Sequence, residues 1–98
     1  MMKVIVKEVG KLPRIEDIEN TLQSLQTLVG GYIETVTLHD NVVLICNEEG
    51  KIAGLPPNFG IGGDTIVGTA VFVAHDGKGE FTDLDDWQVE DIMSRFYV

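Results

Sequence analysis

Residues 57–64 bring together several groups that could bind a small ligand. Asn58 carries an amide that both donates and accepts hydrogen bonds, and Phe59 carries an aromatic face that could stack on a base. Gly62 and Gly63 would let backbone N–H groups approach a phosphate or a carboxylate closely. We therefore expect a bound ligand to contact Asn58, Phe59, Gly62 and Gly63.

An anionic ligand would also need positive charge, and the chain offers few cations for this purpose. The realistic choices are Lys11, Arg14, Lys51 and Arg95, and we expect Arg14 or Lys51 to serve, Arg14 by a bidentate contact with a phosphate. The segment is not a P-loop, because the Lys-Ser/Thr end is absent and a strand is expected to follow. A plain connection between strands is the alternative interpretation, and the sequence leaves both open.

The residues that most often catalyse reactions or bind metals are not arranged for either task. His39, His75 and Cys46 lack the spacing of zinc ligands. Cys46 lies in the most apolar segment, where a free cysteine usually behaves as a small buried hydrophobe. The paired carboxylates stand in turns and on a helix, which is typical of a solvated face. With no nucleophile, base and oxyanion set in the sequence, we predict a protein that is not an enzyme and that uses no cofactor or metal.

Hydrophobic patterning predicts the elements that must position these groups. Residues 2–9 alternate, with Met2, Val4 and Val6 on one face and Lys3, Ile5 and Lys7 on the other, which predicts a strand. Apolar residues at spacings of three and four predict a helix over residues 15–28, which Gly30-Gly31 would end. Further strands are expected at 32–39, 42–47, briefly 52–55, and 65–74 with Gly68 as a bulge. Residues 58–63 are expected to be a loop.

Two segments give more detailed expectations. Asp40-Asn41 predicts a tight hairpin turn, and the unbroken apolar run that follows it predicts a central strand covered on both faces. A last helix is expected at 86–96, capped by Asp85 with Gln88 as its capping-box partner. Its core-facing residues would be Trp87, Ile92, Met93 and Phe96. The pattern as a whole predicts an α+β fold: a mostly antiparallel sheet of four to five strands with two helices packed on it.

The chain also resembles the domain of unknown function 3846 family, small uncharacterised proteins of phages and bacterial mobile elements. The matching residues are Gly30-Gly31-Tyr32-Ile33-Glu34, the run from Val43 to Lys51, Leu55-Pro56, Asn58, and Asp64 with Ile66-Val67-Gly68. The resemblance covers most of the chain and implies a phage or mobile-element origin. It implies no reaction.

Composition narrows the classes of partner and compartment. Ninety-eight residues predict a single domain, 1–98. The net charge of −9 disfavours a nucleic-acid partner, because phosphate binding needs clustered Lys and Arg. A single cysteine favours a reducing compartment, and no segment has the length of a signal peptide core or of a membrane span. We expect a cytoplasmic protein of the bacterial host cell with no membrane partner.

Two functions are compatible with these observations. The first is a non-enzymatic binding protein of phage or mobile-element origin that sequesters a small nucleotide-like signalling molecule of host defence. The alternative is an acidic protein–protein inhibitor that covers a basic surface of a host protein, since residues 76–98 hold seven acids and two bases. Apolar Phe96, Tyr97 and Val98 at the C-terminus favour a homo-oligomer, most simply a dimer, with docking on the same chain as the alternative.

Overall fold

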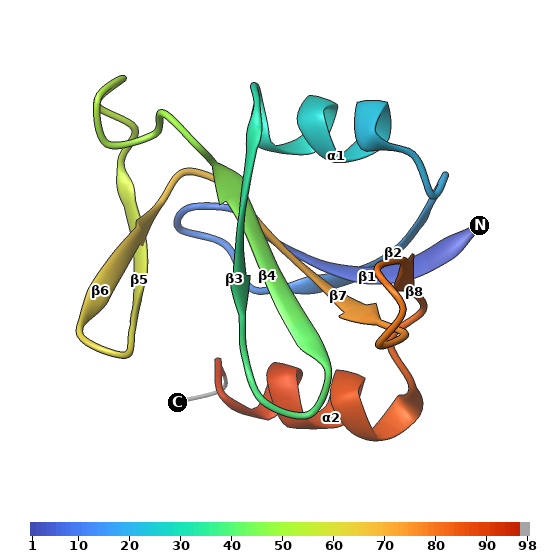
Figure 1. The fold of residues 1–98 in the computed structure, drawn as a ribbon. Coiled ribbons are helices and arrows are strands. Elements are labelled where there is room, and N and C mark those ends of the chain that lie inside the picture. Colours follow the sequence, from blue (N-terminus) through green and yellow to red (C-terminus); the bar gives the residue numbers. More distant parts are fainter. Residues whose placement is uncertain (97–98) are drawn as a thin grey trace.

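The computed structural model describes residues 1–96, which form an α+β fold around one antiparallel sheet (Figure 1). The main sheet has six strands in the order β2-β1-β7-β4-β3, with β8 beside the end of β7. They are β1 (Met2–Lys7), β2 (Arg14–Ile18), β3 (Ile33–Thr37), β4 (Val42–Asn47), β7 (Ala70–His75) and β8 (Phe81–Thr82). A separate hairpin consists of β5 (Pro57–Ile61) and β6 (Asp64–Val67), and the helices are α1 (Leu22–Val29) and α2 (Asp86–Ser94). The predicted fold class is confirmed, with more strands than expected.

The central strands are buried on both faces because each face carries its own helix (Figure 1). In β4, Val43 and Ile45 pack in the core under α1, whereas Val42, Leu44 and Cys46 pack in the core under α2. The predicted alternation of β1 is confirmed in the same way, since Met2, Val4 and Val6 lie on the α1 side and Ile5 on the α2 side. Period-two alternation thus divides one sheet between two cores.

The hairpin between β3 and β4 turns at Asp40-Asn41, as predicted. Both residues have positive φ, 59° and 62°, which matches the primed turns that suit the twist of paired strands. The Leu38 N–H donates to the Val42 carbonyl across this turn. The turn places His39 beside α2, whose Gln88 side chain donates to the Asp40 carbonyl.

The helix predicted over residues 15–28 is wrong in its first half. Arg14–Ile18 forms β2, whose backbone pairs antiparallel with β1 from Val6↔Arg14 to Met2↔Ile18. Backbone hydrogen bonding along the whole strand outweighs the weak helix preference that the spacing of Ile15 and Ile18 indicates. The helix begins only after Thr21, whose side chain accepts a hydrogen bond from the Ser24 N–H, and it ends at Gly30 with φ 79°, as the sequence predicts.

The segment between β4 and β7 also differs from prediction. Residues 52–55 form turns instead of a strand, with the Leu55 N–H donating to the Gly50 carbonyl. Residues 58–63 are not a loop, because most of them form β5 and Gly62-Gly63 is the tip of the hairpin, with positive φ at both glycines. The long strand expected at 65–74 is divided in two at Gly68, where φ is 72°.

Helix α2 confirms its predicted cap and three of its four predicted core-facing residues, because Ile92 is buried and Met93 and Phe96 pack against the same core. The Asp85 carboxylate accepts from the Gln88 N–H at 2.7 Å, and the Gln88 side chain accepts from the Asp85 N–H at 2.9 Å. Gln88 and Ile92, spaced by four, face the core with Leu84, so Trp87 points outward and is 58% exposed. Its predicted place in the core is wrong.

The C-terminal expectation is tested only in part. Phe96 packs against the core of its own chain, whereas Tyr97 and Val98 lie outside the described residues, so the homo-oligomer stays a prediction. Neither helix in the described part of the chain is long and apolar enough to cross a membrane.

Candidate functional site

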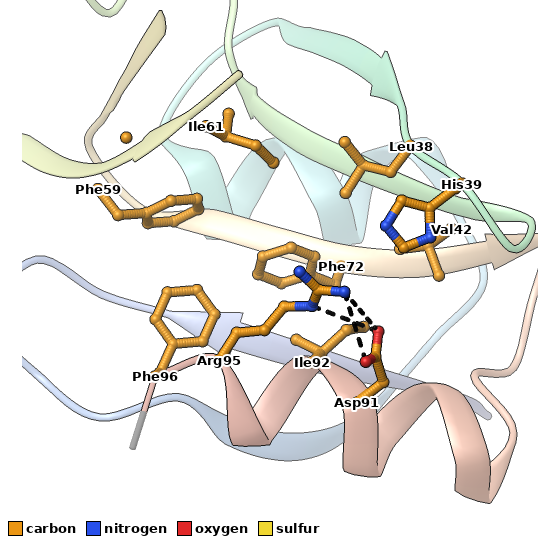
Figure 2. A pocket seen from close by; sticks show the side chains of 11 residues that line it. Leu38, His39, Val42, Phe59, Ile61, Phe72, Asp91, Ile92, Arg95 and Phe96 are labelled. Carbon is orange, nitrogen blue, oxygen red and sulfur yellow. Dashed lines mark hydrogen bonds and ion pairs between the residues drawn. The ribbon is translucent and has the colours of Figure 1, made fainter. Parts of the chain in front are cut away.

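A cavity of about 590 Å³ lies between α2, the β5–β6 hairpin and the α2-facing side of the sheet (Figure 2). Its size is within the range of small-molecule sites. Val42 of β4 and Phe72 of β7 contribute from the sheet, and β5 contributes Phe59, Gly60 and Ile61. The other lining residues are Leu38, His39, Asp91, Ile92, Arg95 and Phe96.

Three phenylalanines from three distant segments meet at one end of this cavity. Phe59 stacks nearly parallel to Phe72, with ring centroids 6.0 Å apart and planes at 18°. Phe96 meets Phe59 edge-on at 5.1 Å and 78°. Such arrangements are the favourable ones for aromatic rings, so the cluster presents an ordered apolar wall to an occupant.

Two charged groups of the cavity come from the C-terminal end of α2, where Asp91 lies in the last turn and Arg95 is the C-cap. The Arg95 guanidinium bonds the Asp91 carboxylate at 3.3 to 3.4 Å, an i,i+4 pair on one helix face (Figure 2). Contacts of this length are weaker than ideal charge-assisted hydrogen bonds, which are about 2.7–2.9 Å. Both groups therefore retain capacity to bond an occupant.

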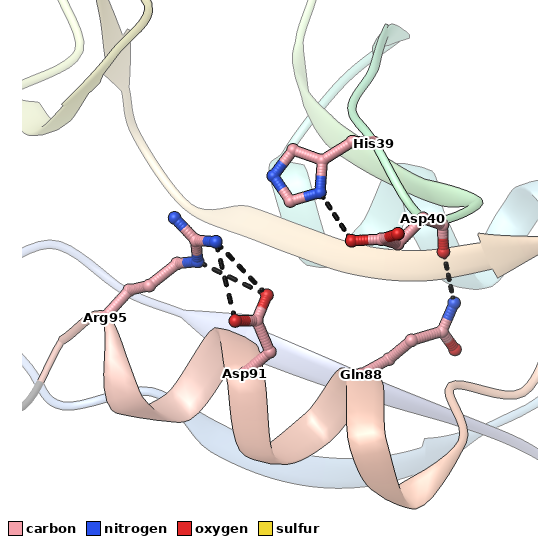
Figure 3. A network of polar contacts seen from close by, with 5 residues as sticks. All are labelled: His39, Asp40, Gln88, Asp91 and Arg95. Atoms are coloured by element: carbon pink, nitrogen blue, oxygen red, sulfur yellow. Dashed lines mark hydrogen bonds and ion pairs between the residues drawn. The ribbon is translucent and has the colours of Figure 1, made fainter.

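A second polar pair stands across the cavity from Arg95 (Figure 3). His39 Nδ1 lies 2.7 Å from the Asp40 carboxylate, and Gln88 Nε2 donates to the Asp40 carbonyl at 2.7 Å. Gln88, which also caps α2, is 6% exposed. The start of α2 is thereby attached to the β3–β4 turn, and His39 is held at the cavity edge.

Of the residues predicted to bind a ligand, Phe59 lines the cavity and Asn58 does not. The Asn58 side chain points into the protein, where Nδ2 donates to the carbonyls of Lys7 and Gly68, both at 2.8 Å. Its Oδ1 accepts from the Lys7 ammonium at 2.9 Å. These bonds fasten the hairpin to β1, so Asn58 has a structural role.

The remaining four predicted residues are dispersed. Gly62 and Gly63 form the hairpin tip and are not among the residues that line the cavity. Lys51 pairs with Asp64 at 2.7 Å, and this contact raises the pKa of Lys51 and lowers the pKa of Asp64. Arg14 bonds Glu8 and lies 3.1 Å from Glu16; the bond from Arg14 lowers the pKa of Glu8. The six predicted residues do not form one site.

Sequence reasoning missed Lys7, although the signal was present. Its place in the alternation of β1 puts it on the face that carries Ile5, and the side chain is only 8% exposed. The ammonium donates to two neutral oxygens, Asn58 Oδ1 and the Glu8 carbonyl at 2.8 Å, and lies 6.0 Å from the centre of the Phe96 ring. Lys7 therefore sits behind the aromatic wall of the cavity.

The prediction of a buried Cys46 is confirmed. The side chain is 7% exposed. Burial, and to a lesser extent the nearby Glu34 carboxylate, raises the pKa of the thiol, which disfavours the reactive thiolate. No cluster of three or more His, Cys, Asp or Glu side chains suited to a metal ion occurs among residues 1–96.

The fold and the cavity define a small antiparallel α+β protein with an aromatic-walled pocket between helix α2 and a hairpin that is not part of the main sheet. The chain belongs to the domain of unknown function (DUF3846) family, whose sequence model matches residues 2–97. No curated protein and no solved structure matches it.

Proposed function

We propose that this protein is a non-enzymatic binding protein whose cavity takes a small ligand with a planar ring. The observation that carries the proposal is a 590 Å³ cavity walled by three phenylalanines, with one arginine, one carboxylate and one imidazole as its polar groups. A mainly apolar pocket with few convergent polar groups is the usual form of a small-molecule site.

Two further observations support binding without catalysis and a nucleotide-like ligand. Among the described lining residues, His39 and Asp91 could transfer protons, but no Ser, Thr, Cys or Lys side chain accompanies them as a nucleophile. A planar base would bury its faces against aromatic rings, as nucleobases do on protein aromatics. The phage or mobile-element origin implied by the resemblance suggests that the ligand is a signalling molecule of host defence, held out of circulation.

A thermal-shift screen against nucleosides, nucleotides and cyclic nucleotides tests the proposal. A ligand at 100 times its Kd should stabilise the fold by about 2.7 kcal/mol through mass action. For any hit, Arg95→Gln should weaken binding, whereas Arg14→Gln, the same change outside the cavity, should not. Failure of every ring-bearing compound to stabilise the protein would contradict the proposal, as would equal effects of the two variants.

A second candidate function, inhibition of a basic host protein, is favoured by the outer face of α2. Trp87 is 58% exposed, and Asp83, Asp86 and Glu90 are exposed around it. Exposed tryptophans are frequent energetic centres of protein interfaces, and the carboxylates would suit a partner of opposite charge.

The tryptophan itself offers the test of this second function, because it is the only one in the chain. Binding of a basic protein over α2 should change the fluorescence of Trp87, and Trp87→Ala should abolish co-purification of that partner. Retention of the partner by Trp87→Ala would exclude this surface. Arg95→Gln should leave the interaction intact, which separates it from ligand binding in the cavity.

A further inference from the structure

The polar groups of the cavity suit the edge of a base better than they suit phosphate. We infer that the cavity recognises a guanine-type purine through its hydrogen-bonding edge, and that phosphate groups on the ligand weaken binding. This inference rests on the proposed ligand-binding function and specifies its ligand.

The aromatic wall of the cavity favours a flat ligand. Phe59 and Phe72 lie within 18° of parallel, and Phe96 stands across them, so the apolar end of the cavity offers both ring faces and a ring edge. A flat bicyclic ring gains from contact with such a surface on its face, and every nucleobase has that face. Stacking therefore favours a planar ring without selecting among bases.

The Arg95–Asp91 pair distinguishes among the bases by its hydrogen-bonding groups. Arg95 supplies hydrogen-bond donors in a planar fork, and Asp91 supplies acceptors directly beside it (Figure 2). Guanine carries the acceptors O6 and N7, which an arginine contacts bidentately, and next to them the N1–H and N2–H donors, which a carboxylate accepts. The adjacent donor and acceptor groups of the protein thus complement adjacent acceptor and donor groups of guanine. Adenine offers fewer matching pairs, and cytosine and uracil have smaller rings.

The charges around the cavity disfavour a phosphate group. The Arg95 cation is already paired with Asp91, and His39 is paired with Asp40, so the charged groups around the cavity include as many fixed carboxylates as potential cations. The whole chain carries a net charge of −9. A phosphate entering beside Asp91, with the Asp40 carboxylate next to His39, meets like charge, which opposes binding at the contact and at long range.

Titration calorimetry with guanosine, GMP, GTP, adenosine and cytidine tests the inference. We expect guanosine to bind most tightly and GTP to bind roughly tenfold or more weakly, a ratio that narrows as salt screens the repulsion. Adenosine and cytidine should bind more weakly than guanosine. GTP binding more tightly than guanosine, or no preference among the bases, would overturn the inference while leaving the proposed function in place.

Two variants with the same change of charge locate the effect. Asp91→Asn removes the negative charge and replaces one of the two acceptor oxygens with an N–H donor, so it should weaken guanosine binding and narrow the ratio between the affinities for guanosine and GTP. Glu90→Gln removes one negative charge from the adjacent residue of the same helix, which does not line the cavity, and should change neither quantity. Equal effects of the two variants would show that binding depends only on the net charge of the protein. That result would overturn the proposal that Asp91 contacts the base. Binding by none of the five compounds would overturn both the inference and the proposed nucleotide-like ligand.

Discussion

Replacing Asn58 with alanine should destabilise the fold because one amide links three groups of the protein interior. The substitution removes a charge-assisted bond to the Lys7 ammonium and two bonds to the carbonyls of Lys7 and Gly68. A bond to a charged group contributes about 1.5–3 kcal/mol and a neutral one about 0.5–1.5 kcal/mol. Because water can reach part of this site, we expect the lower end of the sum, about 3 kcal/mol. That is a large fraction of the roughly 5–15 kcal/mol available to a domain.

Urea denaturation followed by circular dichroism measures this loss. The matched control is Asn20→Ala, which removes a single exposed amide bond to the Phe81 carbonyl and should cost no more than about 1 kcal/mol. Asn58→Asp keeps the acceptor for Lys7 but loses both donors, so its cost should fall between the two. If Asn58→Ala costs no more than Asn20→Ala, the amide does not fasten the hairpin and the structural role assigned to it is wrong.

Three further outcomes are expected. Gly68→Ala should destabilise the fold by about 1–3 kcal/mol, because φ is 72° and the added Cβ would lie 2.7 Å from a leucine methyl carbon. The control Gly10→Ala, at φ 73° with open space around it, should cost only the backbone strain of about 1 kcal/mol. Equal losses of stability in the two variants would show that the contact with the leucine does not matter. Glu8 and Asp64 have pKa values lowered by their cationic partners, so the unfolded chain binds more protons in acid and stability should fall as pH drops from about 5 to 3. In the double variant Glu8→Gln with Asp64→Asn, the melting temperature should fall less steeply as the pH is lowered. A pH dependence equal to that of the unaltered protein would show that these two carboxylates do not cause the loss of stability. Cys46 should react with a thiol reagent at pH 8 far more slowly in the native protein than in urea, because burial raises its pKa; equal rates would mean that the strand opens readily.

Local chemistry predicted the elements whose signals lie within a few residues. The Asp40-Asn41 turn follows from two residues that tolerate positive φ, and the cap of α2 follows from Asp85 with Gln88 three residues later. Strand β4 was predicted with its observed bounds because a run of apolar β-formers needs no partner to be recognised. By contrast, residues 14–18 become a strand only because β1 lies beside them, and their own spacing favoured a helix.

The candidate site could be predicted only in part, because it depends on contacts between distant segments. Phe59 was predicted, but its ring partners Phe72 and Phe96 come from a strand and a helix end far along the chain. Asn58 had the chemistry of a ligand-binding residue, and its partner Lys7 is 51 residues away. Whether an amide faces solvent or the interior is decided by that packing, which periodicity does not contain.

The hairpin of β5 and β6 bonds its own backbone and contributes no strand to the main sheet. The two cores of the sheet therefore do not depend on the hairpin for their hydrogen-bonded register, while the cavity depends on it for one wall. Substitutions in the hairpin that spare Asn58 and Ile66 should therefore alter the cavity wall and leave the strand pairing of the main sheet unchanged. In this architecture the wall of the cavity and the strand pairing of the sheet can vary separately.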